Sequence, residues 1–188
     1  MEIYLVRHTA VGCAAGTCYG QLDVELAPTF QQEAERVEKK LSDVLPGALL
    51  FSSPLTRCLT LAQYIARDGE VTVDDRLKEL NFGDWEGKPW SDLDWQDTSL
   101  WMKDYVHRKC PNGESYGDLF ARMNHFFDEI ENTDIERVII FSHAGILRSA
   151  LARYASLTPE MSFVFRVDYG GVCKIAPKPH RLIHYVNR

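Results

Sequence analysis

The sequence predicts an α/β fold, a three-layer sandwich in which a mostly parallel central sheet is flanked by helices. Short apolar runs rich in β-branched residues alternate with longer segments that carry helix-start signals, and this alternation is typical of parallel sheets covered on both faces. No internal repeat, low-complexity tract or linker divides the 188 residues. A chain of this length fits one domain, so we expect a single domain over 1–188.

Five runs have the length and composition of β-strands. They lie at 2–6, 48–52, 137–142, 162–167 and 181–186. Each run is bounded by turn or polar residues, so we expect all five to join one sheet. Binding sites in such sheets gather at the carboxyl ends of the strands, and the residues that follow each run therefore need inspection.

Three segments carry the signals of helix starts. They lie at 28–44, 54–67 and 115–131. Pro28 and Pro54 open the first two, and proline is favoured in the first turn of a helix. Ser115 opens the third as a predicted N-cap, and Asp118 approximates the acidic partner of a capping box.

The segment 83–113 departs from this alternation. It contains all four tryptophans of the chain, together with many acidic residues: Trp85, Trp90, Trp95 and Trp101. We expect an insertion that forms a small tryptophan-rich cap. Aromatic side chains bury large areas, so packing of the cap onto the core is the favoured role, and stacking on a flat substrate ring is the alternative.

Composition excludes several classes of partner. The net charge of −6 argues against non-specific binding of nucleic acid, which needs clustered Lys and Arg. No apolar run approaches the roughly 20 residues of a membrane span, and the N-terminal run is too short for a signal peptide. We therefore expect a cytoplasmic protein. Five cysteines without a C-x-x-C pair predict reduced thiols rather than disulfides or a zinc site.

Histidines follow two of the predicted strands. Arg7-His8-Thr9 comes directly after the first strand, and His143 follows the strand at 137–142, with a glycine two residues later that allows close backbone approach. A lone histidine at a strand end is more often a hydrogen-bonded structural residue. Two of them at the same edge of one sheet favour a functional site, and the adjacent arginine suits phosphate chemistry.

Two further segments carry charged groups suited to that chemistry. At 52–57 a strand ends and a helix begins, which brings backbone N–H groups, a helix N-terminus and Arg57 to one place. Glu79 lies between Leu77 and Leu80, where a partly buried carboxyl group can carry a proton near neutral pH. Considered alone, Arg57 is as well explained as a solvated side chain at a helix start, and a lone glutamate such as Glu79 is more often a surface charge.

Together these motifs resemble the histidine phosphatase superfamily, also called the phosphoglycerate mutase-like family. Its pattern of R-H after the first strand, S-P-x-x-R-[AC], L-x-E and S-H-[AG]-G occurs in this order over 3–145. The resemblance implies these roles: His8 as the phosphorylated nucleophile, Arg7, Arg57 and His143 as ligands of the phosphoryl oxygens, and Glu79 as the proton donor.

These roles are chemically coherent without a metal or another cofactor. A neutral imidazole attacks phosphorus when a fixed acceptor holds the hydrogen on its other nitrogen. Two guanidiniums and an imidazolium can stabilise the charge on the transferring phosphoryl group. The chain departs from the usual family pattern at Thr9, where glycine is common, and at Ala14, where asparagine is common.

Within this family, the first loop is similar to that of the α-ribazole phosphatases of cobalamin biosynthesis. The similar residues of this loop are R-H-T and the later G-x-C-Y-G-Q-x-D-V. The segment P-N-G-E-S at 111–115 is also similar to that subfamily. The resemblance implies hydrolysis of α-ribazole 5′-phosphate, a small-molecule phosphomonoester. It also makes Thr9, Tyr19, Gly20 and Gln21 candidate substrate contacts, although 16–21 considered alone is better explained as a tight turn.

Other activities remain open within the same family. They are a broad-specificity phosphatase, a phosphoglycerate mutase, a sugar bisphosphatase, and a silent member that binds phosphoryl groups without catalysis. Family mutases are usually longer after L-x-E, and a silent member needs neither His8 nor Glu79, so hydrolysis is favoured. His180 and His184 lie in a predicted strand, where their spacing makes a poor metal pair.

Overall fold

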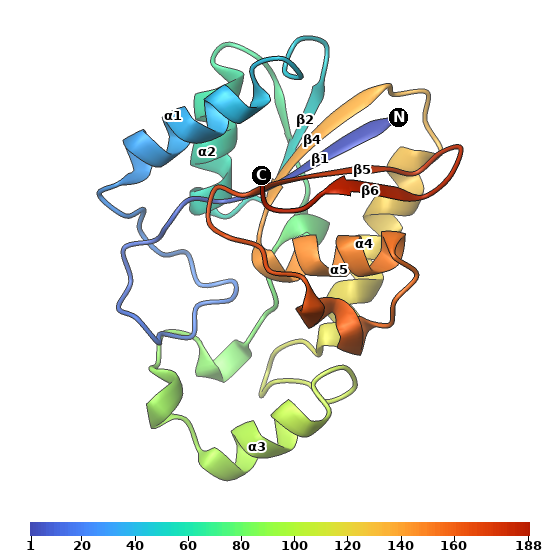
Figure 1. Cartoon of the computed structure of the whole chain (residues 1–188). Coiled ribbons are helices and arrows are strands. Elements are labelled where there is room, and N and C mark those ends of the chain that lie inside the picture. The colour runs from blue at the N-terminus through green and yellow to red at the C-terminus, as the bar shows by residue number, and fades with distance from the viewer.

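The computed structural model describes residues 1–188 and contains one six-stranded sheet with helices on both faces (Figure 1). The strands are β1 (Glu2–Arg7), β2 (Leu49–Ser52), β3 (Val71–Val73), β4 (Arg137–Ser142), β5 (Val172–Ala176) and β6 (Leu182–Tyr185). Their order across the sheet is β3-β2-β4-β1-β5-β6. The first three pairings in this order are parallel and the last two antiparallel. The predicted fold class is confirmed.

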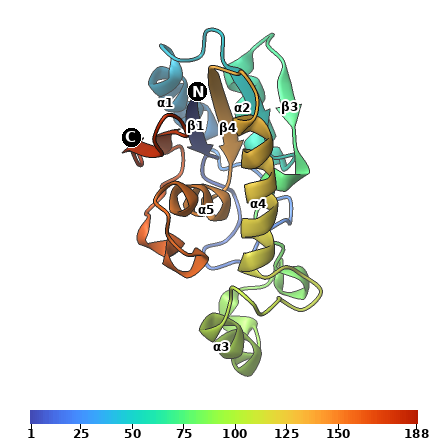
Figure 2. The ribbon, with the colours of Figure 1, turned by 90° about the vertical axis from the view of Figure 1, so that its right-hand side faces the viewer.

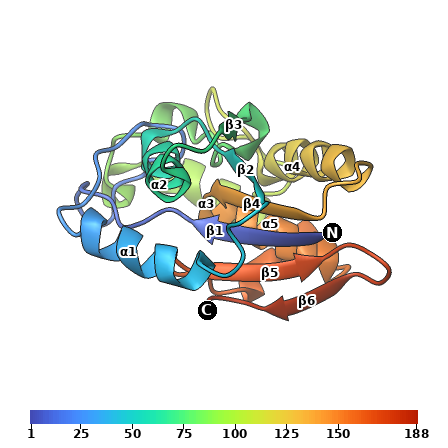
Figure 3. The same ribbon diagram turned by 90° about the horizontal axis from the view of Figure 1, so that it is seen from above.

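The helices are α1 (Phe30–Leu41), α2 (Thr56–Ala66), α3 (Trp95–Lys103), α4 (Tyr116–Glu131) and α5 (Ala144–Tyr154). All of them except α3 form the two outer layers (Figure 3). Four short 3₁₀ turns accompany them: η1 (Asp75–Leu77), η2 (Gly83–Trp85), η3 (Trp90–Asp92) and η4 (Pro159–Val164). The predicted helices are present as α1, α2 and α4, whereas α3 and α5 were not predicted. None of the helices has the length and hydrophobicity that crossing a membrane requires.

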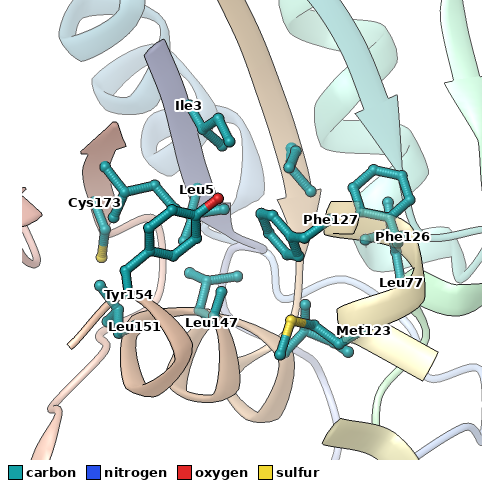
Figure 4. Packing of buried hydrophobic residues seen from close by; sticks show 14 of the residues in the cluster. Ile3, Leu5, Leu77, Met123, Phe126, Phe127, Leu147, Leu151, Tyr154 and Cys173 are labelled. Carbon is teal, nitrogen blue, oxygen red and sulfur yellow. The ribbon is translucent and has the colours of Figure 1, made fainter. Parts of the chain in front are cut away.

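Side chains of β1 alternate between the two outer layers, as the period of a strand requires. Ile3 and Leu5 belong to the core cluster that includes α4 and α5. Tyr4 and Val6 belong to the cluster that includes α1 and α2. Figure 4 shows the first cluster, in which Leu5 lies above the apolar side chains of α5. Burial on both faces explains why this strand reads as an uninterrupted apolar run.

The predicted strand at 162–167 is wrong. This run begins inside η4, where the backbone hydrogen bonds are local rather than between strands. The N–H of Phe165, for example, donates to the carbonyl of Ser162 at 3.2 Å. The strand that pairs with β1 on the side away from β4 is β5, which begins ten residues after the predicted strand. The short edge strand β3 was not predicted either. A short apolar run does not by itself distinguish a strand from a helical turn, because either one can bury its apolar side chains.

The segment 83–113 holds η2, η3 and α3 and lies beyond the end of the sheet toward which β4 points (Figure 2). Three of its tryptophans contact one another: ring centroids are 5.7 Å apart for Trp85 and Trp101 and 6.3 Å apart for Trp90 and Trp101. Trp95 is 76% exposed and takes no part in this packing. The tryptophans therefore pack chiefly within the segment, and the assignment of a cap stays a prediction.

The start of α4 is fixed by a complete capping box, closer to ideal than the sequence indicated. The N–H of Asp118 donates to the hydroxyl of Ser115 at 3.1 Å, and the N–H of Ser115 donates to the carboxylate of Asp118 at 2.9 Å. We expect Ser115→Ala to lower the free energy of unfolding by about 1 kcal/mol, because the backbone N–H of Asp118 loses its side-chain acceptor. Urea denaturation measures this change. Ser42→Ala, at an exposed position that caps no helix start, serves as the control; equal midpoints for the two variants would contradict the prediction.

Candidate active site

The two predicted histidines meet at the carboxyl ends of neighbouring parallel strands. In the pairing of β1 with β4, Arg7 lies opposite Ser142, so the next residue of each strand is a histidine at the same level. The ring centroids of His8 and His143 are 5.2 Å apart, and both side chains are buried. The register of one strand pair therefore brings together residues that are far apart in the sequence.

The ring of His8 is held in one tautomer. Its Nδ1 lies 2.7 Å from the carbonyl oxygen of Thr9, which can only accept, so Nδ1 carries the hydrogen and Nε2 keeps the lone pair. Burial, together with the positive charges of Arg57 and Arg7, holds the pKa of His8 well below 6.5. The imidazole is therefore neutral at neutral pH, as a nucleophile must be.

Backbone carbonyls fix both predicted arginines. Arg57 is fully buried, and its two terminal nitrogens donate to Gly20 at 2.6 Å and to Leu22 at 3.0 Å. Arg7 donates through Nη1 to Val167 at 2.7 Å. The Nε of Arg7 is buried without a partner, and a buried donor in that condition costs free energy unless a ligand accepts from it.

His143 differs from the expected imidazolium. The Nε of Arg57 donates to its Nδ1 at 3.3 Å, so Nε2 carries the hydrogen and donates to the hydroxyl of Ser53 at 2.8 Å. Burial, Arg57 and His8 lower the pKa of His143 well below 6.5. The ring is therefore neutral, because burial and the nearby positive charge of Arg57 both disfavour a charged imidazole. A phosphoryl dianion between these groups would favour protonation.

Backbone amides from two elements hold the carboxylate of Glu79. Oε1 accepts from the N–H of Leu80 at 3.0 Å, and Oε2 accepts from the N–H of Gly145 at 3.0 Å. A Cβ atom at Gly145 would overlap this carboxylate. The close backbone approach expected at this glycine is therefore to Glu79, the predicted proton donor. The start of α5 and the segment before η2 thus fix one carboxyl group beside the histidines.

Arg122, on α4, supports Glu79 and was not predicted. Its guanidinium donates to the carbonyls of Arg76 at 2.8 Å, Lys78 at 2.6 Å and Glu79 at 2.8 Å. It also pairs with the carboxylate of Glu114 at 2.9 Å. An arginine on a helix that is otherwise half apolar gives no sequence signal of these partners, because they all come from distant segments.

A cavity of about 150 Å³ opens on these groups. Its lining consists of Arg7, His8, Thr17, Cys18, Tyr19, Gly20, Arg57, Glu79, Phe82 and Trp90. Four of the predicted catalytic residues therefore line one cavity, whereas the fifth, His143, is fully buried and does not line it. Trp90 is the one tryptophan that lines the cavity.

The four predicted substrate contacts divide into two pairs. Tyr19 and Gly20 line the cavity, whereas Thr9 and Gln21 do not. The hydroxyl of Thr9 is buried without a partner, and the side chain of Gln21 donates to the carbonyl of Glu79 at 3.0 Å. Contact of each with a substrate stays a prediction. No group of three or more His, Cys, Asp or Glu side chains is placed to hold a metal ion.

A family model described as the histidine phosphatase superfamily, branch 1, matches residues 3–186. The chain belongs to this superfamily. In this superfamily member, residues of the R-H, S-P-x-x-R and L-x-E motifs line one cavity, and the histidine of the S-H-x-G motif lies beside His8.

Related proteins resemble this superfamily member over most of its length. An adenosylcobalamin/α-ribazole phosphatase of Escherichia coli is 28% identical over 177 residues, which are 90% of this chain and 87% of the relative. A provisionally named phosphoserine phosphatase of Hydrogenobacter thermophilus is 27% identical and covers 93% of this chain and 88% of its own. The crystal structure of an α-ribazole phosphatase from Shigella flexneri superimposes with a TM-score of 0.91 at 27% identity, covering 100% of this chain and 96% of that one.

The two neutral histidines couple stability to pH. Their pKa values are lowered on folding, so below about pH 6.5 the unfolded chain binds protons that the folded protein does not. Stability is therefore fully present above the unfolded pKa and is lost as the pH falls. We expect each histidine to lower the free energy of unfolding by on the order of 1 kcal/mol as the pH falls from about 7.5 to about 5.5. Urea titrations at both pH values measure this loss.

The variant His143→Gln should lose less stability over that pH interval than the unsubstituted protein. His125→Gln changes an exposed histidine on α4 and is the matched control, with no change in the pH dependence expected. NMR titration of the six histidines gives a direct reading, since two of them should stay neutral at about pH 6. Ordinary titration of all six would refute the prediction.

Proposed function

We propose that this protein hydrolyses phosphomonoesters through a phosphorylated His8. The observation that carries the proposal is the neutral His8 imidazole, held by the carbonyl of Thr9 and lying on the same cavity as Arg7, Arg57 and Glu79. A nucleophile, two fixed cations for phosphoryl oxygens and a carboxyl group for proton transfer are the parts that this reaction needs.

In the first step, Nε2 of His8 attacks phosphorus and the bond from phosphorus to the leaving oxygen breaks. Glu79, protonated at the start, gives its proton to that oxygen, so the alcohol leaves neutral. Arg7 and Arg57 stabilise the charge that spreads over the phosphoryl oxygens. The buried, unpartnered Nε of Arg7 supports this role, because a phosphoryl oxygen would supply the acceptor that it lacks.

In the second step, water attacks phospho-His8. The Glu79 carboxylate takes a proton from the water, a new phosphorus–oxygen bond forms, and the bond from phosphorus to Nε2 breaks. Inorganic phosphate and a neutral His8 result, and Glu79 is protonated again. The hydrogen bond from Nδ1 to the carbonyl of Thr9 keeps the ring in one orientation through both steps.

We further propose α-ribazole 5′-phosphate as the substrate. Residues 17–20 of the first loop, whose sequence is similar to that of the α-ribazole phosphatases, line the cavity and support this assignment. The similarity to relatives named for that activity also supports it. Phe82 and Trp90 give the cavity an apolar side on which a flat aromatic ring could pack. The relative named for phosphoserine makes a smaller substrate the competing assignment.

The chemistry predicts sharp losses in two variants. His8→Ala should abolish release of inorganic phosphate, because the proposed phosphohistidine intermediate can no longer form. Glu79→Gln should slow turnover by about 10²-fold or more, the usual scale of general acid–base catalysis. Steady-state phosphate release from p-nitrophenyl phosphate in EDTA measures both, with His125→Ala as the matched surface control. Activity in His8→Ala, or near-normal turnover in Glu79→Gln, would remove that residue from its role.

The substrate assignment predicts a preference that depends on Trp90. The value of kcat/KM should be higher for α-ribazole 5′-phosphate than for phosphoserine, 3-phosphoglycerate or p-nitrophenyl phosphate. Trp90→Ala should raise KM for the ribazole substrate about tenfold, the scale of one stacked ring, and change KM for phosphoserine little. Trp95→Ala, at the 76% exposed position outside the cavity, is the control. Comparable rates on all four compounds would indicate a broad-specificity phosphatase instead.

A further inference from the structure

Two tyrosines from distant segments meet over the arginines of the site. The Arg7 guanidinium carbon lies 3.8 Å from the ring centre of Tyr169, and that of Arg57 lies 5.4 Å from the ring centre of Tyr19. The two phenol oxygens are 2.8 Å apart, which is a hydrogen bond. We call this pair the tyrosine bridge. It joins the first loop of the chain to the segment before β5 and spans both phosphoryl-binding arginines.

The segment that carries Tyr169 is fastened to the backbone of the nucleophile. The N–H of Gly170 donates to the carbonyl of His8 at 3.1 Å, and the N–H of Arg7 donates to the carbonyl of Gly171 at 3.1 Å. Nearby, Val167 supplies the carbonyl that accepts from the Arg7 side chain at 2.7 Å. The ring centroid of Tyr169 is also 5.4 Å from that of His8. These contacts fix the backbone beside Tyr169, from which the ring lies against Arg7.

Turn geometry strengthens this attachment. The N–H of Asp168 donates to the side chain of Asn187 at 2.7 Å, and the side chain of Lys40 donates to the carbonyl of Gly170 at 2.9 Å. Gly170 has a φ of +60°, a conformation that glycine adopts without strain. Contacts from α1 and from the segment after β6 thus hold this segment in place from two sides. Tyr169 itself is 41% exposed.

We propose that Tyr19 and Tyr169 are positioning residues that hold the guanidiniums of Arg7 and Arg57 ready for a phosphoryl group; the proposal rests on the phosphatase function proposed above. An arginine side chain has many rotamers, and ordering it on binding costs free energy. A ring stacked on the guanidinium restricts it beforehand, so that cost falls. The hydrogen bond between the phenols makes the two restraints act as one unit.

The bridge also keeps the site electrically suited to an anion. Burial and the neighbouring phenol of Tyr169 raise the pKa of Tyr19, so its phenol stays neutral at any ordinary pH. A neutral ring face attracts the guanidinium without cancelling its charge. A carboxylate in the same place would also fix Arg7, but its negative charge would oppose the phosphoryl group. Aromatic residues are therefore the suitable kind of restraint here.

The test measures binding of the phosphoryl group separately from turnover. Tyr169→Leu removes the stacked ring and should raise both the inhibition constant of inorganic phosphate and KM for p-nitrophenyl phosphate by about tenfold. Tyr169→Phe keeps the ring and should change them by about threefold or less. Tyr185→Leu is the matched control, since Arg188 lies 5.6 Å from its ring away from the site. Thermal unfolding of each variant confirms that the fold is intact.

The hydrogen bond between the phenols has a separate readout. If the bridge acts as one unit, the double variant Tyr19→Phe with Tyr169→Phe should bind phosphate no more weakly than either single variant. Additive losses would overturn the linked restraint. An unchanged phosphate inhibition constant in a folded Tyr169→Leu protein would overturn the positioning role.

The failure of the proposed function has a different signature. It would leave the unsubstituted protein unable to release phosphate from any of the four compounds. Calorimetric titration with inorganic phosphate then still tests the bridge, because that binding needs the arginines and no chemistry. Equal phosphate affinity in the unsubstituted protein and Tyr169→Leu would reject the inference in that case also.

Discussion

The parallel pairing of β1 with β4 is the constraint on which the rest of the site depends. Because Arg7 lies opposite Ser142, the two strands deliver His8 and His143 to the same level with their rings 5.2 Å apart. A shift of one residue in this register would turn one of the two side chains to the other face of the sheet. The apolar residues of both strands resist such a shift, since both faces of the sheet are buried.

Burial and positive charge together define the chemistry available at this edge. Neither histidine reaches solvent freely, and the neighbouring guanidiniums disfavour a charged imidazole, so both rings are neutral. The same guanidiniums are fixed by carbonyl groups rather than by carboxylates, as with Arg57 and Gly20. Their charge therefore remains available to an incoming anion. The site gathers positive charge locally on a chain whose net charge is −6.

Segments outside the sheet set the remaining geometry. Arg122 holds the backbone around Glu79 by donating to three carbonyls, and the N–H of Gly145 donates to the Glu79 carboxylate. On the other side, the turn before β5 brings Tyr169 onto Arg7. The nucleophile belongs to a strand end, whereas the groups that orient its partners come from α4, α5 and two loops. The reacting group therefore lies at the end of a buried central strand, whereas much of the cavity wall comes from loops.

The sequence by itself determined the sheet-and-helix class, the starts of three helices and the motif residues His8, Arg7, Arg57, Glu79 and His143. These are local signals, because apolar runs, helix caps and short motifs each consist of residues that are close together in the sequence. Only the tertiary structure decided that 172–176 rather than 162–167 joins the sheet, which carbonyl fixes the His8 tautomer, and that Arg122 and Tyr169 support the site. Such contacts join residues far apart in the chain, and their free energy depends on distances and burial that exist only once the chain has folded.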